Sequence, residues 1–100
     1  MEEIFGQLPR LYRAGLVETP ISYYFSLDDV KKSIVLTPAG CSVADGRTEA
    51  DCVCKTTKEF FLKIWNDGYR PGMKDFLSGM IKSNNPGALR VFLQSFGKDV

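Results

Sequence analysis

Apolar residues near the start of the chain recur at the spacing of an amphipathic helix. They are Ile4, Leu8, Leu11 and Tyr12. Positions three or four apart lie on one face of a helix, so this segment is predicted to be helical. Pro9 falls within the run, and it either interrupts the helix or opens its second turn, because proline lacks a backbone N–H and fixes φ. Residues 14–20 then form a connector.

Four short segments with alternating, β-branched or aromatic residues predict strands. They cover residues 21–27, 32–37, 41–44 and 50–56. Turn-forming residues separate them: Asp28-Asp29, Pro38-Ala39-Gly40, and Asp45-Gly46 with a loop over residues 47–49. Short connections between neighbouring strands favour a mostly antiparallel sheet with helices on one face.

An aromatic helix is predicted over residues 57–67. Its apolar face consists of Phe60, Phe61, Ile64 and Trp65. Thr56 lies three residues before Glu59, which is the spacing of a capping box at a helix start. Gly68 can adopt the left-handed conformation that ends many helices.

The last thirty residues predict helix, strand and helix. Residues 71–78 begin with a proline suited to a first turn and place Phe76 and Leu77 inward, and Gly79 leads into a strand over 79–83. Asn85 is a natural N-cap with Pro86 at the first helical position. Over residues 86–96 the apolar positions keep the helical period: Leu89, Phe92, Leu93 and Phe96. Gly97 ends this helix.

Composition places the chain among ordinary globular domains. One hundred residues, 44% apolar and 25% charged, with a formal net charge of +1, predict a single domain over residues 1–100. The sequence lacks the basic stripe that is typical of proteins that bind nucleic acid. The sequence contains no apolar run of about 20 residues, as a membrane span requires, and no secretory leader pattern. Three cysteines outside a disulfide-rich context favour a reducing cytoplasm.

Catalytic chemistry has few candidates. The chain has no histidine, which removes histidine-based nucleophilic pairs and most zinc sites. The acidic pairs Glu2-Glu3 and Asp28-Asp29 are expected on the solvated surface. No catalytic residue, metal or cofactor is therefore expected.

The cysteines have two interpretations. Cys52 and Cys54 are two apart on a strand and share a face. If Cys41 lay on the neighbouring strand, three thiols could meet in a metal or redox site. Burial as small apolar residues is favoured, because a fourth ligand is missing and the spacing is not Cys-x-x-Cys.

The aromatic residues also have two interpretations. Tyr23, Tyr24, Tyr69 and Arg70 could stack nucleic-acid bases, but strand pairing and loop packing are favoured without a basic stripe. The aromatic helix faces could line a ligand cavity, although their pattern alone favours a packed core.

The order of these motifs resembles the sterol carrier protein type 2 family. The similarity runs from about Lys32 to Phe96. It comprises Ile34-Val35-Leu36, Cys41-Ser42-Val43, Asp45-Gly46, the Ala-Asp pair before Cys52, Phe60, Gly68 to Pro71, Phe76 before Gly79, Met80-Ile81-Lys82 and the Leu89 to Leu93 spacing. The start of the chain, Ile4-Phe5 to Leu8-Pro9, also resembles the family's first helix.

This resemblance implies an α+β fold in which a five-stranded, mostly antiparallel sheet is covered on one face by helices that enclose an apolar tunnel. It implies non-catalytic binding of a fatty acyl chain, an isoprenoid or a sterol-like lipid. Carried over by position, the tunnel lining is Ile34, Phe60, Ile64, Phe76, Leu77, Met80, Ile81, Leu89, Phe92 and Phe96. The expected partner is a lipid or another apolar small molecule, with transient contact with a membrane surface as an option.

The sequence departs from the family at several positions. Ser83 stands where the last strand is usually apolar, and Asn85-Pro86 replaces a glycine turn. The chain lacks a peroxisomal signal, which favours a cytoplasmic location and makes a sterol a less suitable ligand. The alternative function is a dimerisation or assembly module of a larger system, with a filled or vestigial tunnel.

Overall fold

The structure is a computed structural model that describes residues 2–46 and 49–98, which form four helices and one five-stranded sheet. The strands are β1 (Ile21–Leu27), β2 (Val30–Thr37), β3 (Gly40–Asp45), β4 (Cys52–Thr56) and β5 (Ile81–Ser83). They lie in the order β3-β2-β1-β4-β5. The predicted loop over residues 47–49 lies partly outside the described residues.

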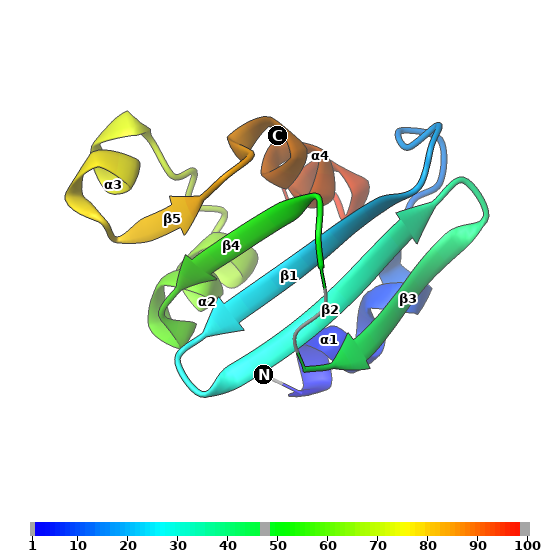
Figure 1. The fold of residues 1–100 in the computed structure, drawn as a ribbon, viewed down its shortest axis with the longest axis horizontal. Coiled ribbons are helices and arrows are strands. Elements are labelled where there is room, and N and C mark those ends of the chain that lie inside the picture. The colour runs from blue at the N-terminus through cyan, green and yellow to red at the C-terminus, as the bar shows by residue number, and fades with distance from the viewer. Residues whose placement is uncertain (1, 47–48, 99–100) are drawn as a thin grey trace.

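The sheet is mostly antiparallel, as predicted. Among the described strands, only the pairing of β1 with β4 is parallel, with Tyr23 opposite Cys52 and Leu27 opposite Thr56. Because β4 runs parallel to β1, it starts at the end of the sheet where β1 starts (Figure 1). The central strand β1 therefore pairs with β2 of the β1–β2–β3 meander on one side and with β4 on the other.

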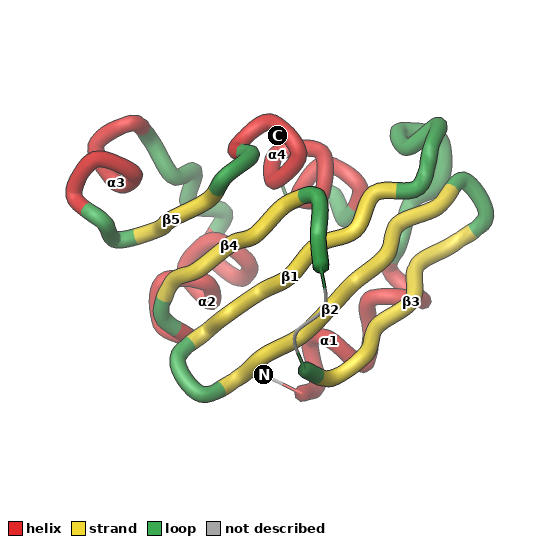
Figure 2. The backbone as a smooth tube through the Cα atoms, viewed as in Figure 1, coloured by secondary structure: helices red, strands yellow, loops and turns green. Residues whose placement is uncertain are grey.

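Three helices cover one face of the sheet. These are α1 (Glu2–Leu11), α2 (Lys58–Asp67) and α4 (Pro86–Ser95), and the short α3 (Met73–Ser78) lies beside β5 at the edge (Figures 1 and 2). The α+β class and the one-sided helical layer are therefore confirmed. Pro9 does not end α1, which continues to Leu11.

Aromatic rings fill the space between the sheet and these helices. Phe25 of β1 lies 6.2 Å from Phe5, 5.9 Å from Phe61 and 4.8 Å from Phe92, measured between ring centroids. Phe92 also packs on Phe96 at 4.9 Å. Such separations are typical of favourable aromatic pairs. The core is thus a continuous stack of rings from all three covering helices.

The ends of the helices agree with most of the predicted signals. Gly68 has a φ of 71° and Gly79 a φ of 83°, the left-handed region that glycine enters without steric cost. The Asn85 side chain accepts a hydrogen bond from the Ala88 N–H at 3.2 Å, with Pro86 in the first turn. These residues set where α2, α3 and α4 start and stop.

Two local predictions are wrong. The N-cap of α2 is Thr57, whose Oγ1 accepts from the Phe60 N–H at 3.0 Å, whereas the Thr56 hydroxyl donates to the Met80 carbonyl. Leu77, predicted to face inward, is 81% exposed. Because α3 has only six residues and buries none completely, its sequence period does not fix which side faces the core.

Candidate functional site

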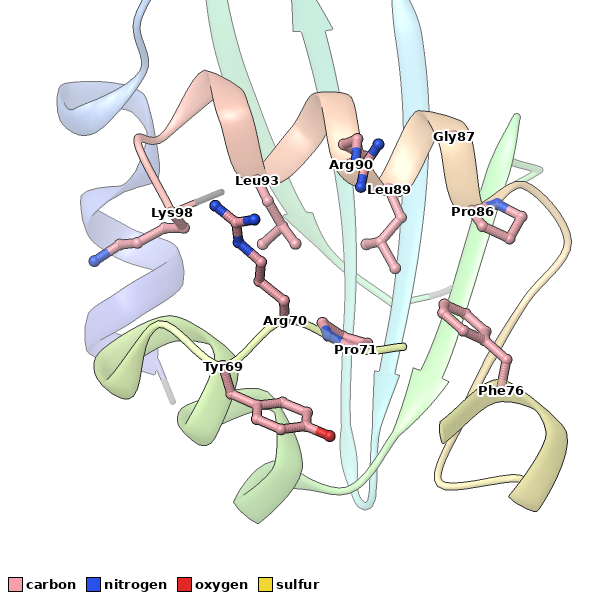
Figure 3. A pocket seen from close by; sticks show the side chains of 10 residues that line it. All are labelled: Tyr69, Arg70, Pro71, Phe76, Pro86, Gly87, Leu89, Arg90, Leu93 and Lys98. Carbon is pink, nitrogen blue, oxygen red and sulfur yellow. The ribbon is translucent and has the colours of Figure 1, made fainter. Parts of the chain in front are cut away.

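The main candidate site is a groove bounded by α3, α4 and the segment that links α2 to α3 (Figure 3). Its volume is about 270 Å³. The lining residues are Tyr69, Arg70, Pro71, Phe76, Pro86, Gly87, Leu89, Arg90, Leu93 and Lys98. We call this site the α3–α4 groove.

Hydrogen bonds hold one wall of the groove in place. The Tyr69 hydroxyl donates to Asp75 Oδ2 at 2.6 Å, and the Gly72 N–H donates to the same oxygen at 2.9 Å. The bond to Tyr69 lowers the pKa of Asp75 and raises the pKa of Tyr69. Asp75 therefore fixes the start of α3 against the preceding segment. The next residue, Phe76, lines the groove.

The helix α4 supplies the other wall. Leu89 and Leu93 are one turn apart and are only 5% and 8% exposed, so they form an apolar floor between the groove and the core. Below them the Tyr23 hydroxyl donates to the Ala88 carbonyl at 2.8 Å. That bond fixes the first turn of α4 on the central strand.

Three cations complete the lining. Arg70, Arg90 and Lys98 line the groove, and none of its described lining residues is acidic. The Lys98 ammonium lies 4.8 Å from the centre of the Trp65 ring, a cation–π distance. Apolar side chains and positive charges thus line one groove.

The ten residues predicted to line a tunnel lie in three different places in the structure: the α3–α4 groove, the exposed surface and the core. Phe76 and Leu89 lie in the α3–α4 groove, and Leu77 and Met80 are exposed. The others are buried in the core: Ile34, Phe60, Ile64, Ile81, Phe92 and Phe96. The tunnel itself stays a prediction.

Sequence reasoning missed the cationic part of the groove. The sequence offers Tyr69 and Arg70 as a stacking surface together with Tyr23 and Tyr24, but the structure buries Tyr23 and Tyr24, which are 1% and 7% exposed. The signal that could have found the groove is the alternation of apolar and basic residues at its two walls, Tyr69-Arg70 and Leu89-Arg90.

The cysteines do not form one cluster. Cys52 and Cys54 are buried on the helix-covered face of β4, whereas β2 and β1 separate β4 from Cys41 on β3. Burial raises the pKa of Cys54 to about 12 and that of Cys41 to about 11. Within the described residues, no group of three or more acidic residues, cysteines or histidines is placed to hold a metal ion.

The acidic pairs Glu2-Glu3 and Asp28-Asp29 lie at the surface, and one acid of each pair binds a lysine side chain. Glu2 and Asp45 both bind the Lys32 ammonium, and the Lys32 side chain is only 6% exposed. Asp29 pairs with Lys58 at 2.8 Å. These ion pairs give Glu2, Asp45 and Asp29 a structural role. Nowhere in the described ranges is a helix long and apolar enough to cross a membrane.

Comparisons with known proteins found similarity in structure alone. No protein-family model and no curated protein sequence matches the chain. The sec-alkylsulfatase Pisa1 from Pseudomonas sp. superimposes on 97% of the chain with a TM-score of 0.73 and 17% identity, and the chain spans only 16% of that enzyme.

Two smaller proteins match over most of their own length. A ubiquinone synthesis protein, UbiJ-SCP2, covers 95% of this chain and 86% of its own, with a TM-score of 0.64 and 14% identity. Sterol carrier protein 2 covers 97% of this chain and 84% of its own, with a TM-score of 0.51 and 12% identity. The chain therefore has the fold of the sterol carrier protein 2 domain.

Proposed function

We propose that the chain binds an apolar molecule with one anionic end, such as a fatty acid, in the α3–α4 groove and does not transform it. The observation that supports this most directly is the lining itself, in which Phe76, Leu89 and Leu93 lie among Arg70, Arg90 and Lys98. Ligand sites are typically apolar with a few placed polar groups that fix orientation. The shared fold with proteins named for sterol carriage and ubiquinone synthesis agrees with a lipid-like ligand.

The size of the groove favours one chain over a ring system. Its volume of about 270 Å³ is close to the lower end, about 300 Å³, of typical small-molecule sites. An unbranched acyl chain fits such a space better than a sterol. An isoprenoid alcohol would fill it equally well but would bring no negative charge to the cationic side chains of the lining.

The test compares dodecanoate with dodecanol by titration calorimetry. Hydrogen bonds to a charged group contribute about 1.5–3 kcal/mol, so the acid is expected to bind at least about tenfold more tightly. Phe76→Ala should weaken both ligands, and Arg70→Gln should weaken the acid alone. Arg10→Gln, the same change of charge on α1, serves as the control. Absence of dodecanoate binding, or equal binding of both ligands that Phe76→Ala does not affect, would refute this site.

A second candidate function is an assembly module. It is favoured by the match to a short part of a much larger enzyme, the alkylsulfatase, and by the ring-filled core. Native mass spectrometry of the freshly purified protein separates the two functions. A carrier is expected to retain one lipid per chain, whereas a module should carry no lipid and associate with itself or with a partner chain in a concentration-dependent way.

A further inference from the structure

The helix α3 presents an apolar face that nothing in the described chain covers. Met73 and Leu77, one helical turn apart, are 79% and 81% exposed, and Met80 just after the helix is 49% exposed. Side chains four apart lie on the same face of a helix. We call these three residues the α3 ridge. It lies at the edge of the molecule, beside β5 (Figure 1).

A row of lysines crosses the neighbouring part of the sheet. Lys31 of β2 is opposite Ser26 of β1, Ser26 is opposite Lys55 of β4, and Lys55 is opposite Lys82 of β5. All three lysines are exposed, and they lie on the face opposite the helices. Like charges directly opposite each other on a sheet destabilise it. The directly opposed pair of Lys55 and Lys82 therefore costs stability that an anionic partner would restore. Lys31 is opposite Ser26 and donates hydrogen bonds to Ser26 Oγ and to the Asp28 carbonyl, each at 2.6 Å.

The α3 ridge and the lysine row meet at Met80. This residue lines one hollow of about 250 Å³ together with Lys31, Lys55 and Lys82. Asp28 also lines this hollow, but its carboxylate accepts a hydrogen bond from the Lys58 N–H at 2.9 Å. The acid of α3, Asp75, is bound to Tyr69 and Gly72. These hydrogen bonds leave both acids charged, but three lysines and one acid line the hollow, so its net charge next to the exposed apolar side chains is positive.

We propose that the α3 ridge and the lysine row form a docking surface for an anionic phospholipid bilayer. Flexible, unbranched or γ-branched side chains such as methionine and leucine can enter the boundary between headgroups and acyl chains, while lysines remain among the headgroups. Lysine is a compact hydrated point charge, which suits a mobile layer of phosphates better than a fixed carboxylate pair on a protein. Because Phe76 of the same helix lines the α3–α4 groove, docking would bring that groove to the lipid surface.

The experiment is co-sedimentation with vesicles of phosphatidylcholine alone and of phosphatidylcholine mixed with phosphatidylglycerol. The wild-type protein should bind the mixed vesicles, and this binding should fall as salt screens the lysines. Lys55→Gln and Lys82→Gln should each weaken it about fivefold. Met73→Ser and Leu77→Ser should weaken it as well, without loss of folding because both positions are exposed.

Matched controls lie on other parts of the surface. Leu16→Ser removes a 54% exposed leucine from the connector after α1, and Arg10→Gln removes a charge from α1; neither should alter vesicle binding. Leu77→Trp provides a direct readout, since emission of the introduced indole should shift to the blue with mixed vesicles. Dodecanoate binding in solution, measured on the same variants, should stay unchanged, which separates this surface from the ligand site.

Three outcomes would overturn the proposal. They are no binding to the mixed vesicles, equal binding to both vesicle types, and binding that the four variants leave unchanged. A loss of self-association in Met73→Ser and Leu77→Ser, with no vesicle binding in the wild type, would instead identify the α3 ridge as a contact between copies of the chain.

Discussion

Truncation of Phe92 to alanine tests whether the space between sheet and helices is packed. Phe92 is completely buried, and its ring lies 5.2 Å from Tyr23, 4.8 Å from Phe25 and 4.9 Å from Phe96. A buried Phe→Ala change costs about 3–5 kcal/mol, because contacts are lost and a cavity remains. With ring partners on several sides, we expect a value near the upper end of that range.

The assay is urea unfolding followed by circular dichroism, analysed by linear extrapolation with unchanged slope. For a domain of this size each kcal/mol corresponds to about 4–8 °C in Tm, so a thermal melt gives an independent check. Phe76→Ala is the matched control. Phe76 is half-buried at the α3–α4 groove, and the same change there should cost less than about 2 kcal/mol.

The outcome that contradicts this reasoning is a loss below about 2 kcal/mol for Phe92→Ala as well. A side chain that already borders empty or ligand-filled space loses fewer contacts when it is shortened. Such a result would favour the predicted tunnel over the packed core. If Phe92→Ala proves too unstable to purify, Phe92→Leu gives the same comparison with a smaller expected loss.

Three further predictions concern single side chains. Cys41, which is partly exposed, should react with a thiol reagent in native buffer before Cys54, which is buried and whose pKa is raised to about 12; equal rates would contradict the structure. Thr57→Ala should cost about 1 kcal/mol in urea melts, because it removes the N-cap of α2, and a neutral effect would contradict this assignment. Hydrogen bonds to Asp45 and Glu2 raise the pKa of Lys32 above 10.5. The stability that this ion pair adds relative to Lys32→Met is therefore full below pH 10.5 and should fall as pH rises through the folded-state pKa, measured as the difference between the two melting curves.

Local signals explain why the sequence predicted most of the elements. Gly68 and Asn85-Pro86 each carry a conformational preference of their own, so helix ends could be placed without tertiary information. The sequence places the cap of α2 one residue too early, because the hydroxyls of Thr56 and Thr57 are equally suitable acceptors for a helix N–H, and only the bond that Thr56 donates to the Met80 carbonyl separates them. That bond joins segments that are distant in sequence.

The site depends on tertiary contacts that no local pattern encodes. Arg70 follows α2 and Arg90 lies on α4, and both line one groove because the bond between Tyr69 and Asp75 fixes the path between α2 and α3. Helical period indicated that Leu89 and Leu93 share a face, but not that this face borders a groove. Leu77 shows the same limit, because a helix of six residues is too short for its period to indicate an inner side.

The parallel pairing of β1 with β4 has a consequence for how the chain folds. β1 reaches β2 through a two-residue turn, with Leu27 opposite Val30, whereas Tyr23 and its partner Cys52 are separated in the sequence by β2 and β3. Hairpins close in microseconds, while contacts between distant segments must first overcome the entropy of loop closure. The β1–β2–β3 meander is therefore expected to assemble early and to act as a template on which β4, and through it β5, is ordered late. In hydrogen exchange, the amides of β5 should open well before those of β2.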